Sequence, residues 1–270
     1  DADLFYGRLM KAYGTPNTIS HSALCNEDNK AGNWYARGQY AYSAIDYEES
    51  NYILAFGTPF LESHRPTSAT LAAWPRGRRG RAVRPKTVVV DPRLSVTGTR
   101  ADEWIPINPG TDGALALGIA QEILTAGLWD KKFVGDFKDG TNKFVTGQAV
   151  NEADWVDTYS TGLPAWWNLF LKDFTPEEAA KKTGVPADTI KRIAREFATS
   201  KPAVTVRGRG AGAWPGNGTY NVYAIYALNG LVGSVDVKGG VNHYPSVNFS
   251  AELLPGEQDD TAKNGAKKAR

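Results

Sequence analysis

The stretch Thr87–Leu124, TVVVDPRLSVTGTRADEWIPINPGTDGALALGIAQEIL, decides the fold. An apolar, β-branched run ends at Asp91, and a second short strand is predicted at Trp104–Ile107. Apolar residues then recur at helical spacing, with Thr111 or Asp112 placed to cap the helix. Open α/β sheets bind ligands beyond the carboxyl ends of their strands. The two carboxylates that follow these strands therefore predict a nucleotide held by its sugar hydroxyls and its base edge.

Two further predicted strands run into glycine. Tyr52–Phe56 is followed by Gly57, and Ala203–Arg207 is followed by a glycine-rich loop and a helix at about Thr219–Leu231. Glycine lets the backbone approach a ligand closely, and a helix N-terminus attracts anions, so both places suit a phosphate. Residues 208–213 match a relaxed G-x-G-x-x-A dinucleotide pattern, but no acidic residue follows where a nicotinamide dinucleotide site needs one.

Composition is that of a globular protein with one large domain or two ordinary ones. The 270 residues are 41% hydrophobic and 22% charged. A net charge of +2 does not indicate a nucleic-acid binder, and no apolar run is long enough to insert into a membrane. The chain begins with Asp1 and carries no signal peptide, so we expect a processed chain or part of a longer one.

The single cysteine, Cys25, ends a loop of small polar residues that starts at Gly14. One cysteine excludes an internal disulfide framework and a four-cysteine iron–sulfur cluster within this chain. A lone cysteine is commonly an inert buried side chain, but the polar neighbours of Cys25 favour a functional place. His21, four residues earlier, is either a loop histidine bonded to backbone or a donor that faces the substrate.

Elsewhere the patterns are local. The sequence predicts a capped helix pair within Phe174–Ser200 and a short helix at Trp129–Phe137. Residues 26–30 are expected to form a charged loop, and the aromatic-rich segment that follows is expected to be irregular. Trp74–Lys86, with six basic residues, is interpreted as a solvated loop because it lacks interleaved aromatic residues.

Taken together, the motifs from Gly14 to Val241 resemble, in order, the catalytic subunits of molybdopterin oxidoreductases, the group named after dimethyl sulfoxide reductase. The phrases VVVDPR and WIPINPGTD and the run ALNGLVG carry the resemblance. It implies a bis(molybdopterin guanine dinucleotide) cofactor with molybdenum or tungsten, with Cys25 as metal ligand and His21 as a further catalytic residue. One departure is that Pro59 stands where the family usually has asparagine. The cofactor contacts that the resemblance implies are Asn17, Gly57, Asp91, Arg93, Pro109, Gly110, Asp112, Gly208, Gly210, Gly212 and Asn217.

The resemblance also implies a fold, namely two Rossmann-like α/β domains with mainly parallel sheets, as the central part of a larger catalytic subunit. Residues 18–200 would form an inserted domain with the metal-ligand loop and one guanine dinucleotide site. Residues 1–17 and 201–255 would belong to a second domain with the other site. Residues 256–270 are expected to be a disordered tail or linker.

The function implied is two-electron redox or atom transfer on a sulfur or arsenic oxyanion or polysulfide in anaerobic respiration, because Ser20–Cys25 most resembles the polysulfide, thiosulfate and arsenate reductase branch. A nitrate reductase or formate dehydrogenase relative stays open, as do a nicotinamide-dependent dehydrogenase and a non-catalytic nucleotide-binding module. Expected partners are a small-molecule substrate, an iron–sulfur electron-transfer subunit and a membrane anchor subunit, with no nucleic acid. A [4Fe–4S] cluster is expected only in an N-terminal part that this chain lacks. The branch favours the periplasmic side of the membrane, with a cytoplasmic location left open.

Overall fold

The structure is a computed structural model that describes residues 2–17, 19, 25–64, 66–82, 84–212, 216–243 and 259–266. The chain divides into two compact units, one of residues 1–27 with 245–270 and one of residues 28–244. In the first unit, α1 (Ala2–Tyr13) contacts α12 (Asp260–Ala266). The expected disordered tail therefore contains a helix, whose start is fixed by Asp259 Oδ1 accepting a hydrogen bond from the Ala262 N–H at 2.8 Å.

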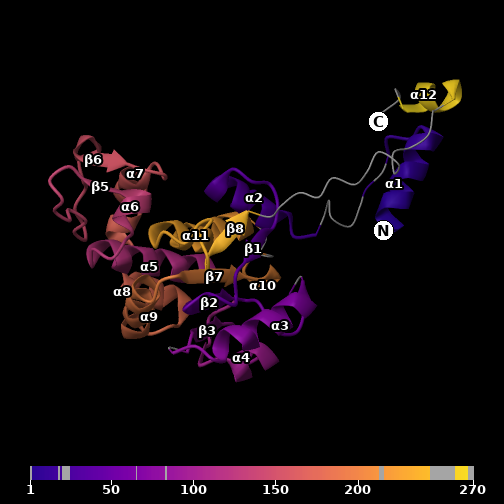
Figure 1. Ribbon diagram of the computed structural model, residues 1–270. Helices are drawn as coiled ribbons and strands as arrows, with labels where there is room; N and C mark the ends of the chain where they lie inside the picture. Colours follow the sequence, from indigo (N-terminus) through magenta and orange to yellow (C-terminus); the bar gives the residue numbers. More distant parts are fainter. Residues whose placement is uncertain are drawn as a thin grey trace. The chain divides into compact units, whose positions relative to one another are not determined.

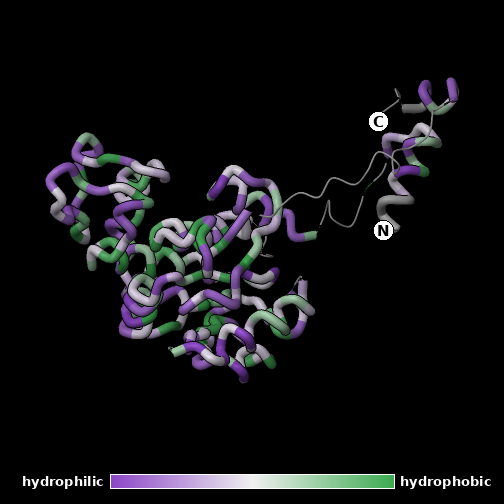
Figure 2. The backbone as a smooth tube through the Cα atoms, in the orientation of Figure 1, coloured by the Kyte–Doolittle hydropathy of each residue, from purple (hydrophilic) through white to green (hydrophobic). Residues whose placement is uncertain are grey.

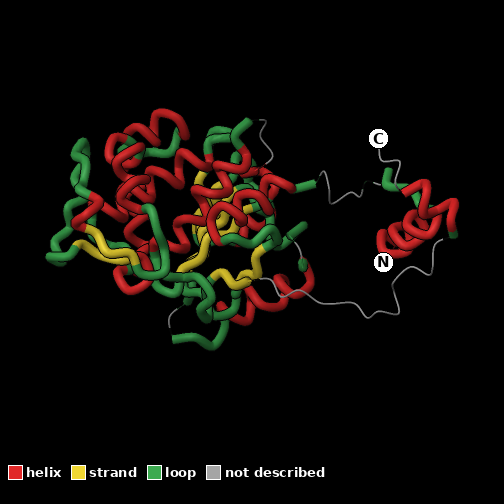
Figure 3. The backbone as a smooth tube through the Cα atoms, turned by 90° about the horizontal axis from the view of Figure 1, so that it is seen from above, coloured by secondary structure: helices red, strands yellow, loops and turns green. Residues whose placement is uncertain are grey.

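The second unit is built on a parallel sheet of order β4-β3-β2-β7. Its strands are β2 (Tyr52–Phe56), β3 (Lys86–Val90), β4 (Glu103–Ile105) and β7 (Ala203–Arg207). Phe56 lies opposite both Val90 and Arg207, so these three strands end level with one another. Figure 3 shows the strands in yellow at the centre of this unit, with helices around them. The predicted α/β class with a parallel sheet is confirmed.

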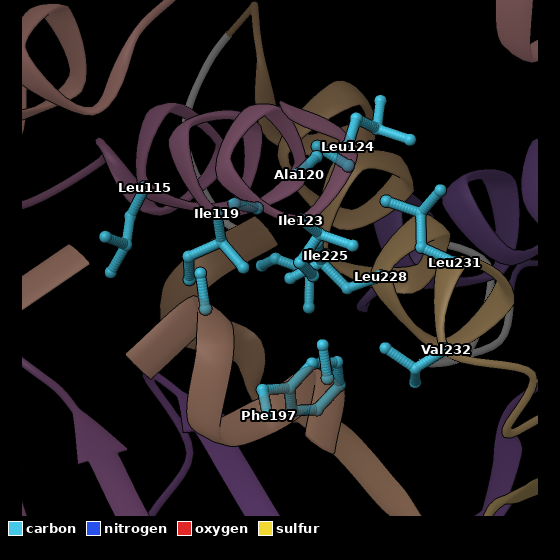
Figure 4. Close-up of a cluster of buried hydrophobic side chains, with 14 of the residues drawn as sticks. Leu115, Ile119, Ala120, Ile123, Leu124, Phe197, Ile225, Leu228, Leu231 and Val232 are labelled. Atoms are coloured by element: carbon cyan, nitrogen blue, oxygen red, sulfur yellow. The ribbon is translucent and has the colours of Figure 1, made fainter. Parts of the chain in front are cut away.

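Each face of the sheet has its own hydrophobic core because side chains alternate along a strand. Tyr52, Leu54 and Phe56 of β2 belong to the larger core, whereas Ile53 and Ala55 belong to the smaller one. The larger core is filled by α5 (Asp112–Thr125), α8 (Pro176–Thr183), α9 (Ala187–Thr199) and α11 (Gly218–Leu231), part of which Figure 4 shows. Trp74 of α3 (Thr67–Arg78) is partly buried and packs against the smaller core.

Figure 1 shows α3 and α4 (Val96–Arg100) on one side of the sheet and α5, α8, α9 and α11 on the other. Among these helices α9 buries one face, whereas α5 and α11 are buried along most of their length. Figure 2 shows hydrophobic and hydrophilic residues mixed along the backbone of this unit. The remaining elements are α2 (Glu27–Arg37), β1 (Ser43–Ile45), α6 (Lys131–Val134), β5 (Gly135–Phe137), η2 (Glu152–Asp154), β6 (Trp155–Asp157), α7 (Leu163–Leu169), η3 (Leu171–Asp173), α10 (Arg209–Gly212) and β8 (Val241–His243). No helix in the described ranges is long and apolar enough to cross a membrane.

The strand after residue 200, β7, does not belong to a separate sheet, as the expected division into two α/β domains at that point would require. β7 pairs in parallel with β2, so the segments before and after residue 200 share one sheet. The physical reason is burial, because Val204 and Val206 pack in the same core as Ile53 and Val89.

Three local expectations also differ from the structure. Residues 26–30 are not a loop, since α2 begins at Glu27. The predicted helix at Trp129–Phe137 is α6 followed by β5, and Gly135, at φ +120°, makes the change because a Cβ there would lie 2.2 Å from the Val156 carbonyl oxygen. The basic segment is partly helical, and its arginines Arg76 and Arg78 form ion pairs with Glu48 and Asp102.

Candidate functional site

The carboxyl ends of the four parallel strands lie at one edge of the sheet, where the predicted nucleotide residues follow them. From β2 the chain first adds β3 and β4 on one side and later returns to place β7 on the other side. Strand order therefore reverses between β2 and β7, and such a switch point leaves a crevice for a ligand. Gly57 follows β2 and Gly208 follows β7, so the two glycines stand at this switch point.

Gly57 and Gly208 bring two backbone segments into direct contact. A Cβ on Gly208 would lie 2.2 Å from the Gly57 carbonyl oxygen and 2.5 Å from the Thr58 Cα, while Gly57 itself has φ +52°. The N–H of Gly57 donates to the Val90 carbonyl and that of Gly208 to the Phe56 carbonyl, both at 2.8 Å. Glycine is therefore required at both positions for the two backbone segments to approach this closely.

We expect Gly208→Ala to destabilise the protein by about 2–4 kcal/mol, because the new methyl group meets backbone atoms that cannot move aside. Urea unfolding of the variant measures this loss. Gly216→Ala would be an unsuitable control, because Gly216 has φ +84°, which alanine adopts only with strain, even though its Cβ would meet no atom within 4 Å. Gly7→Ala is the better control, since a Cβ there meets nothing within 4 Å. A Gly208→Ala variant as stable as Gly7→Ala would contradict the close approach of the two loops.

Asp91 and Arg93, which follow β3, point in different directions. Asp91 is buried, and its Oδ1 accepts a hydrogen bond from the Arg93 N–H at 2.8 Å. The indole N–H of Trp104 donates to the Asp91 carbonyl, also at 2.8 Å. The Arg93 side chain is 65% exposed, with Nη2 3.7 Å from a carboxylate oxygen of Glu62. In this loop the Asp91 carboxylate is therefore buried and held by a hydrogen bond within its own turn, whereas the Arg93 guanidinium is exposed to solvent.

Asp112 opens α5 and is the carboxylate at this edge whose pKa is raised by burial. It is 4% exposed, and burial, with a smaller contribution from the negative charge of Asp91, raises the pKa of Asp112 to about 6. The preceding Gly110 has φ +80°, and Pro109 is exposed. A buried carboxylate with a raised pKa near a second carboxylate is a candidate position for a ligand that donates hydrogen bonds.

The loop after β7 forms a glycine-lined hollow at the start of α11. A Cβ on Gly218 would lie 1.7 Å from the Gly212 carbonyl oxygen, and one on Gly212 would lie 1.6 Å from Asp28 Oδ2. The guanidinium of Arg207, buried at the end of β7, lies 3.8 Å from that same oxygen. The hollow is a cavity of about 350 Å³ lined by Asp28, Tyr35, Gly212, Gly216, Asn217, Gly218, Thr219 and Tyr220.

A helix start whose backbone carries no side chains suits a pyrophosphate, because the helix dipole and its first N–H groups attract anions. The Asp28 carboxylate also lines this hollow and would oppose an anion, with Arg207 beside it as the balancing cation. The buried acid of the α5 turn fits a base edge that donates hydrogen bonds. The predicted residues of the second unit thus gather along one edge, with Gly210 in the same loop as Gly208 and Gly212. The residues present fit the dinucleotide arms of the implied cofactor.

Asn221 of α11 is a site residue that sequence reasoning missed. Its side chain is buried and contacts both the Gly110 loop and the Ala211 loop. The one available signal was weak. Asparagine is disfavoured inside a helix unless its side chain makes a specific hydrogen bond, but many helical asparagines are simply exposed to solvent.

The other predicted residues belong to the first unit or lie outside the described residues. Cys25 is partly buried and stands two residues before α2. Asn17 is exposed, and its N–H donates to Thr15 Oγ1 at 3.2 Å. His21 lies outside the described residues. The assignments of Cys25 as metal ligand and of His21 as catalytic residue stay predictions. Within the described ranges, no group of three or more histidine, cysteine, aspartate or glutamate side chains could hold a metal ion.

Comparison with known proteins gives a consistent result. A family model described as molybdopterin oxidoreductase matches residues 3–269. The chain is 45% identical over 98% of its length to the molybdopterin-containing subunit of arsenate respiratory reductase from Chrysiogenes arsenatis, and 40% identical over 99% to that of Shewanella sp. strain ANA-3; it spans 31% of each. Thiosulfate and dimethyl sulfoxide reductase subunits are less similar relatives.

A solved structure, acetylene hydratase from Pelobacter acetylenicus, matches with a TM-score of 0.61 and 25% identity, covering 85% of this chain and 27% of that one. Most of this chain therefore has a counterpart among experimentally determined folds.

Proposed function

Because this chain belongs to the molybdopterin oxidoreductase family, we propose that it is the central part of the catalytic subunit of an arsenate respiratory reductase. The observation that carries the proposal is the identity to two arsenate respiratory reductase subunits along almost the whole chain. The chain is part of an oxidoreductase, and a molybdopterin-type cofactor with molybdenum or tungsten follows from the family. Family membership therefore favours this proposal over the two alternatives, a nicotinamide-dependent dehydrogenase and a non-catalytic nucleotide-binding module.

The proposed form of the cofactor is bis(molybdopterin guanine dinucleotide). Asp91, Arg93, Pro109, Gly110 and Asp112 would hold one guanosine, the acids by accepting hydrogen bonds from base and sugar. The glycines at the ends of β2 and β7 would leave room for phosphates, with the exposed Asn217 as a further donor. When bound, this cofactor supplies two-electron redox chemistry at a metal that the Cys25 thiolate would ligate.

Arsenate reduction consumes two electrons and two protons for each oxygen lost as water, so an electron donor and a proton source are required. The relatives are named as subunits of respiratory reductases, which implies further subunits. We propose an iron–sulfur electron-transfer subunit and a membrane anchor subunit as partners, with a [4Fe–4S] cluster elsewhere in the longer polypeptide. Location on the periplasmic side is part of the same proposal. His21, four residues before Cys25, would face the substrate as a hydrogen-bond donor.

The test uses the full-length protein purified without oxygen from its native host. We expect molybdenum or tungsten by elemental analysis, guanine nucleotide after acid hydrolysis in the ratio that a bis(guanine dinucleotide) cofactor requires, and faster oxidation of a reduced dye with arsenate than with thiosulfate, polysulfide or nitrate. Faster turnover of thiosulfate or polysulfide would move the protein to that branch of the family. Absence of guanine nucleotide from an active, metal-containing enzyme would contradict the proposed form of the cofactor.

A further inference from the structure

Asn221 joins the two loops that we assign to nucleotides. Its Nδ2 donates to the Gly110 carbonyl at 3.3 Å and to the Ala211 carbonyl at 3.2 Å, and its Oδ1 accepts from Asn217 Nδ2 at 3.1 Å. Gly110 lies between β4 and α5, whereas Ala211 follows β7. A single primary amide in α11 therefore bridges loops that are about a hundred residues apart in the sequence.

The packing around Asn221 leaves no alternative position for this amide. The residue is 2% exposed, and a Cβ on Gly113 would lie 2.3 Å from its Oδ1 and 3.0 Å from its Cα. The first turn of α5, which begins with Asp112, therefore lies directly on Asn221. Further along the same pair of helices, Ile119 and Ile123 of α5 lie close to α11 in the core of Figure 4.

A primary amide has two N–H groups, and here both are directed at backbone carbonyls in a buried place. The bond to the Ala211 carbonyl is buried and the bond to the Gly110 carbonyl is partly buried. If either loop moves, the buried amide loses a partner, which costs more than the loss of an exposed hydrogen bond. The two loops therefore hold their conformations together.

We infer that Asn221 is a positioning residue that couples the two dinucleotide loops, so that a ligand ordering one loop stabilises the other. The inference rests on the proposed function, because it takes each loop to bind one arm of the cofactor. It adds that the two arms are retained as a unit, through one side chain that contacts the assigned residues Gly110 and Asn217.

Asn221→Asp in the full-length holoenzyme tests this coupling. The carboxylate keeps the acceptor for Asn217 and the size of the side chain but cannot donate to either carbonyl. Asn229→Asp is a matched control in the same helix. Asn229 is 1% exposed, its Nδ2 donates to Thr205 Oγ1 at 2.7 Å and its Oδ1 accepts from the Thr205 N–H at 2.8 Å, so it contacts neither loop.

The readout is hydrogen exchange followed by mass spectrometry. In Asn221→Asp we expect the amides of residues 106–112 and of residues 208–212 to exchange about tenfold faster or more, as the loss of buried hydrogen bonds requires. In Asn229→Asp the change should instead be confined to the strand at residues 203–207. Guanine nucleotide should be lost on urea titration at a lower concentration in Asn221→Asp than in the control.

Two results would overturn the coupling. One is faster exchange in a single loop of Asn221→Asp with the other loop unchanged, and the second is an exchange pattern equal to that of Asn229→Asp. If Asn221→Asp does not fold, Gly113→Ala disturbs the same amide sterically and should loosen the same two loops. A wild-type enzyme without guanine nucleotide would defeat the proposed function, whereas the loop exchange would still report whether Asn221 couples the loops.

Discussion

Replacing Cys25 by alanine in the full-length enzyme is expected to abolish arsenate reduction. The thiolate is the one protein ligand that family resemblance assigns to the metal, and a soft anionic sulfur suits a metal otherwise held by dithiolene sulfurs. Loss of a residue that merely supports a ligand costs about 10- to 100-fold in affinity or activity. Loss of the ligand itself should exceed that range. Dye-linked arsenate reduction, normalised to metal content, measures the effect.

Cys25→Ser is the informative partner of this variant, because a hydroxyl oxygen can still ligate the metal but is harder and less polarisable. X-ray absorption at the metal edge should show one sulfur neighbour fewer in both variants, and an added oxygen in the serine variant. Guanine nucleotide content should be unchanged in both, since the nucleotide loops belong to residues 57–218. Unaltered activity and sulfur count in Cys25→Ala would remove Cys25 from its assigned role.

The elements that the sequence predicts well are those determined by local chemistry. The apolar runs became β2, β3 and β7 because such residues fit a buried parallel strand. The helix pair after residue 174 begins and ends as predicted, since Thr175 Oγ1 accepts from the Glu178 N–H at 3.3 Å and Gly184 ends the first helix at φ +74°. The edge of the sheet at which the glycines and acids lie can be predicted from the sequence, because the carboxyl ends of parallel strands all lie at the same edge.

The elements that the sequence does not predict depend on distant contacts. The helix α2 contains Gly32 and two asparagines, which disfavour a helix. However, Gly32 allows Val222 of α11 to approach so closely that a Cβ on Gly32 would lie 2.4 Å from its side chain. The pairing of β7 with β2 joins residues about 150 positions apart and leaves no mark in the periodicity of either strand. Asn221 was missed for the same reason, because its two acceptors are backbone carbonyls.

The ionisation of Asp112 could not be predicted from the sequence either, because it depends on burial. In the cofactor-free fold the pKa of this carboxyl lies at about 6, above its ordinary value of 3.8, so the folded state binds the proton more tightly than the unfolded state. Between these two pKa values stability falls as pH rises, which is the reverse of a salt-bridged aspartate. Above pH 6 the folded state holds an ionised, buried carboxylate at a cost. That cost is acceptable if a ligand donates hydrogen bonds to it, as the N–H groups of guanine would.

We therefore expect Asp112→Asn to have opposite effects on stability and on nucleotide binding. At pH 7.5 the cofactor-free protein should become more stable by up to about 3 kcal/mol, the equivalent of the shift from 3.8 to about 6, because an amide needs no ionisation. The loss of stability between about pH 4 and pH 6 should disappear. Guanine nucleotide should be retained about a hundredfold less well, since the amide offers one acceptor in place of two and no charge. Urea unfolding across pH 4–8 and nucleotide analysis measure the two effects separately.

Asp91→Asn serves as the control because it removes the neighbouring negative charge and leaves the Asp112 carboxylate in place. The pKa of Asp112 should then fall, since the charge of Asp91 contributes to its rise. As a result, the upper limit of the pH range in which stability declines should move below about pH 6. Destabilisation of Asp112→Asn at pH 7.5 would contradict this account, because it would mean that the ionised carboxylate already has a partner within the protein. Stabilisation together with loss of guanine would instead show that the fold holds Asp112 unfavourably until a nucleotide binds, as functional sites commonly do.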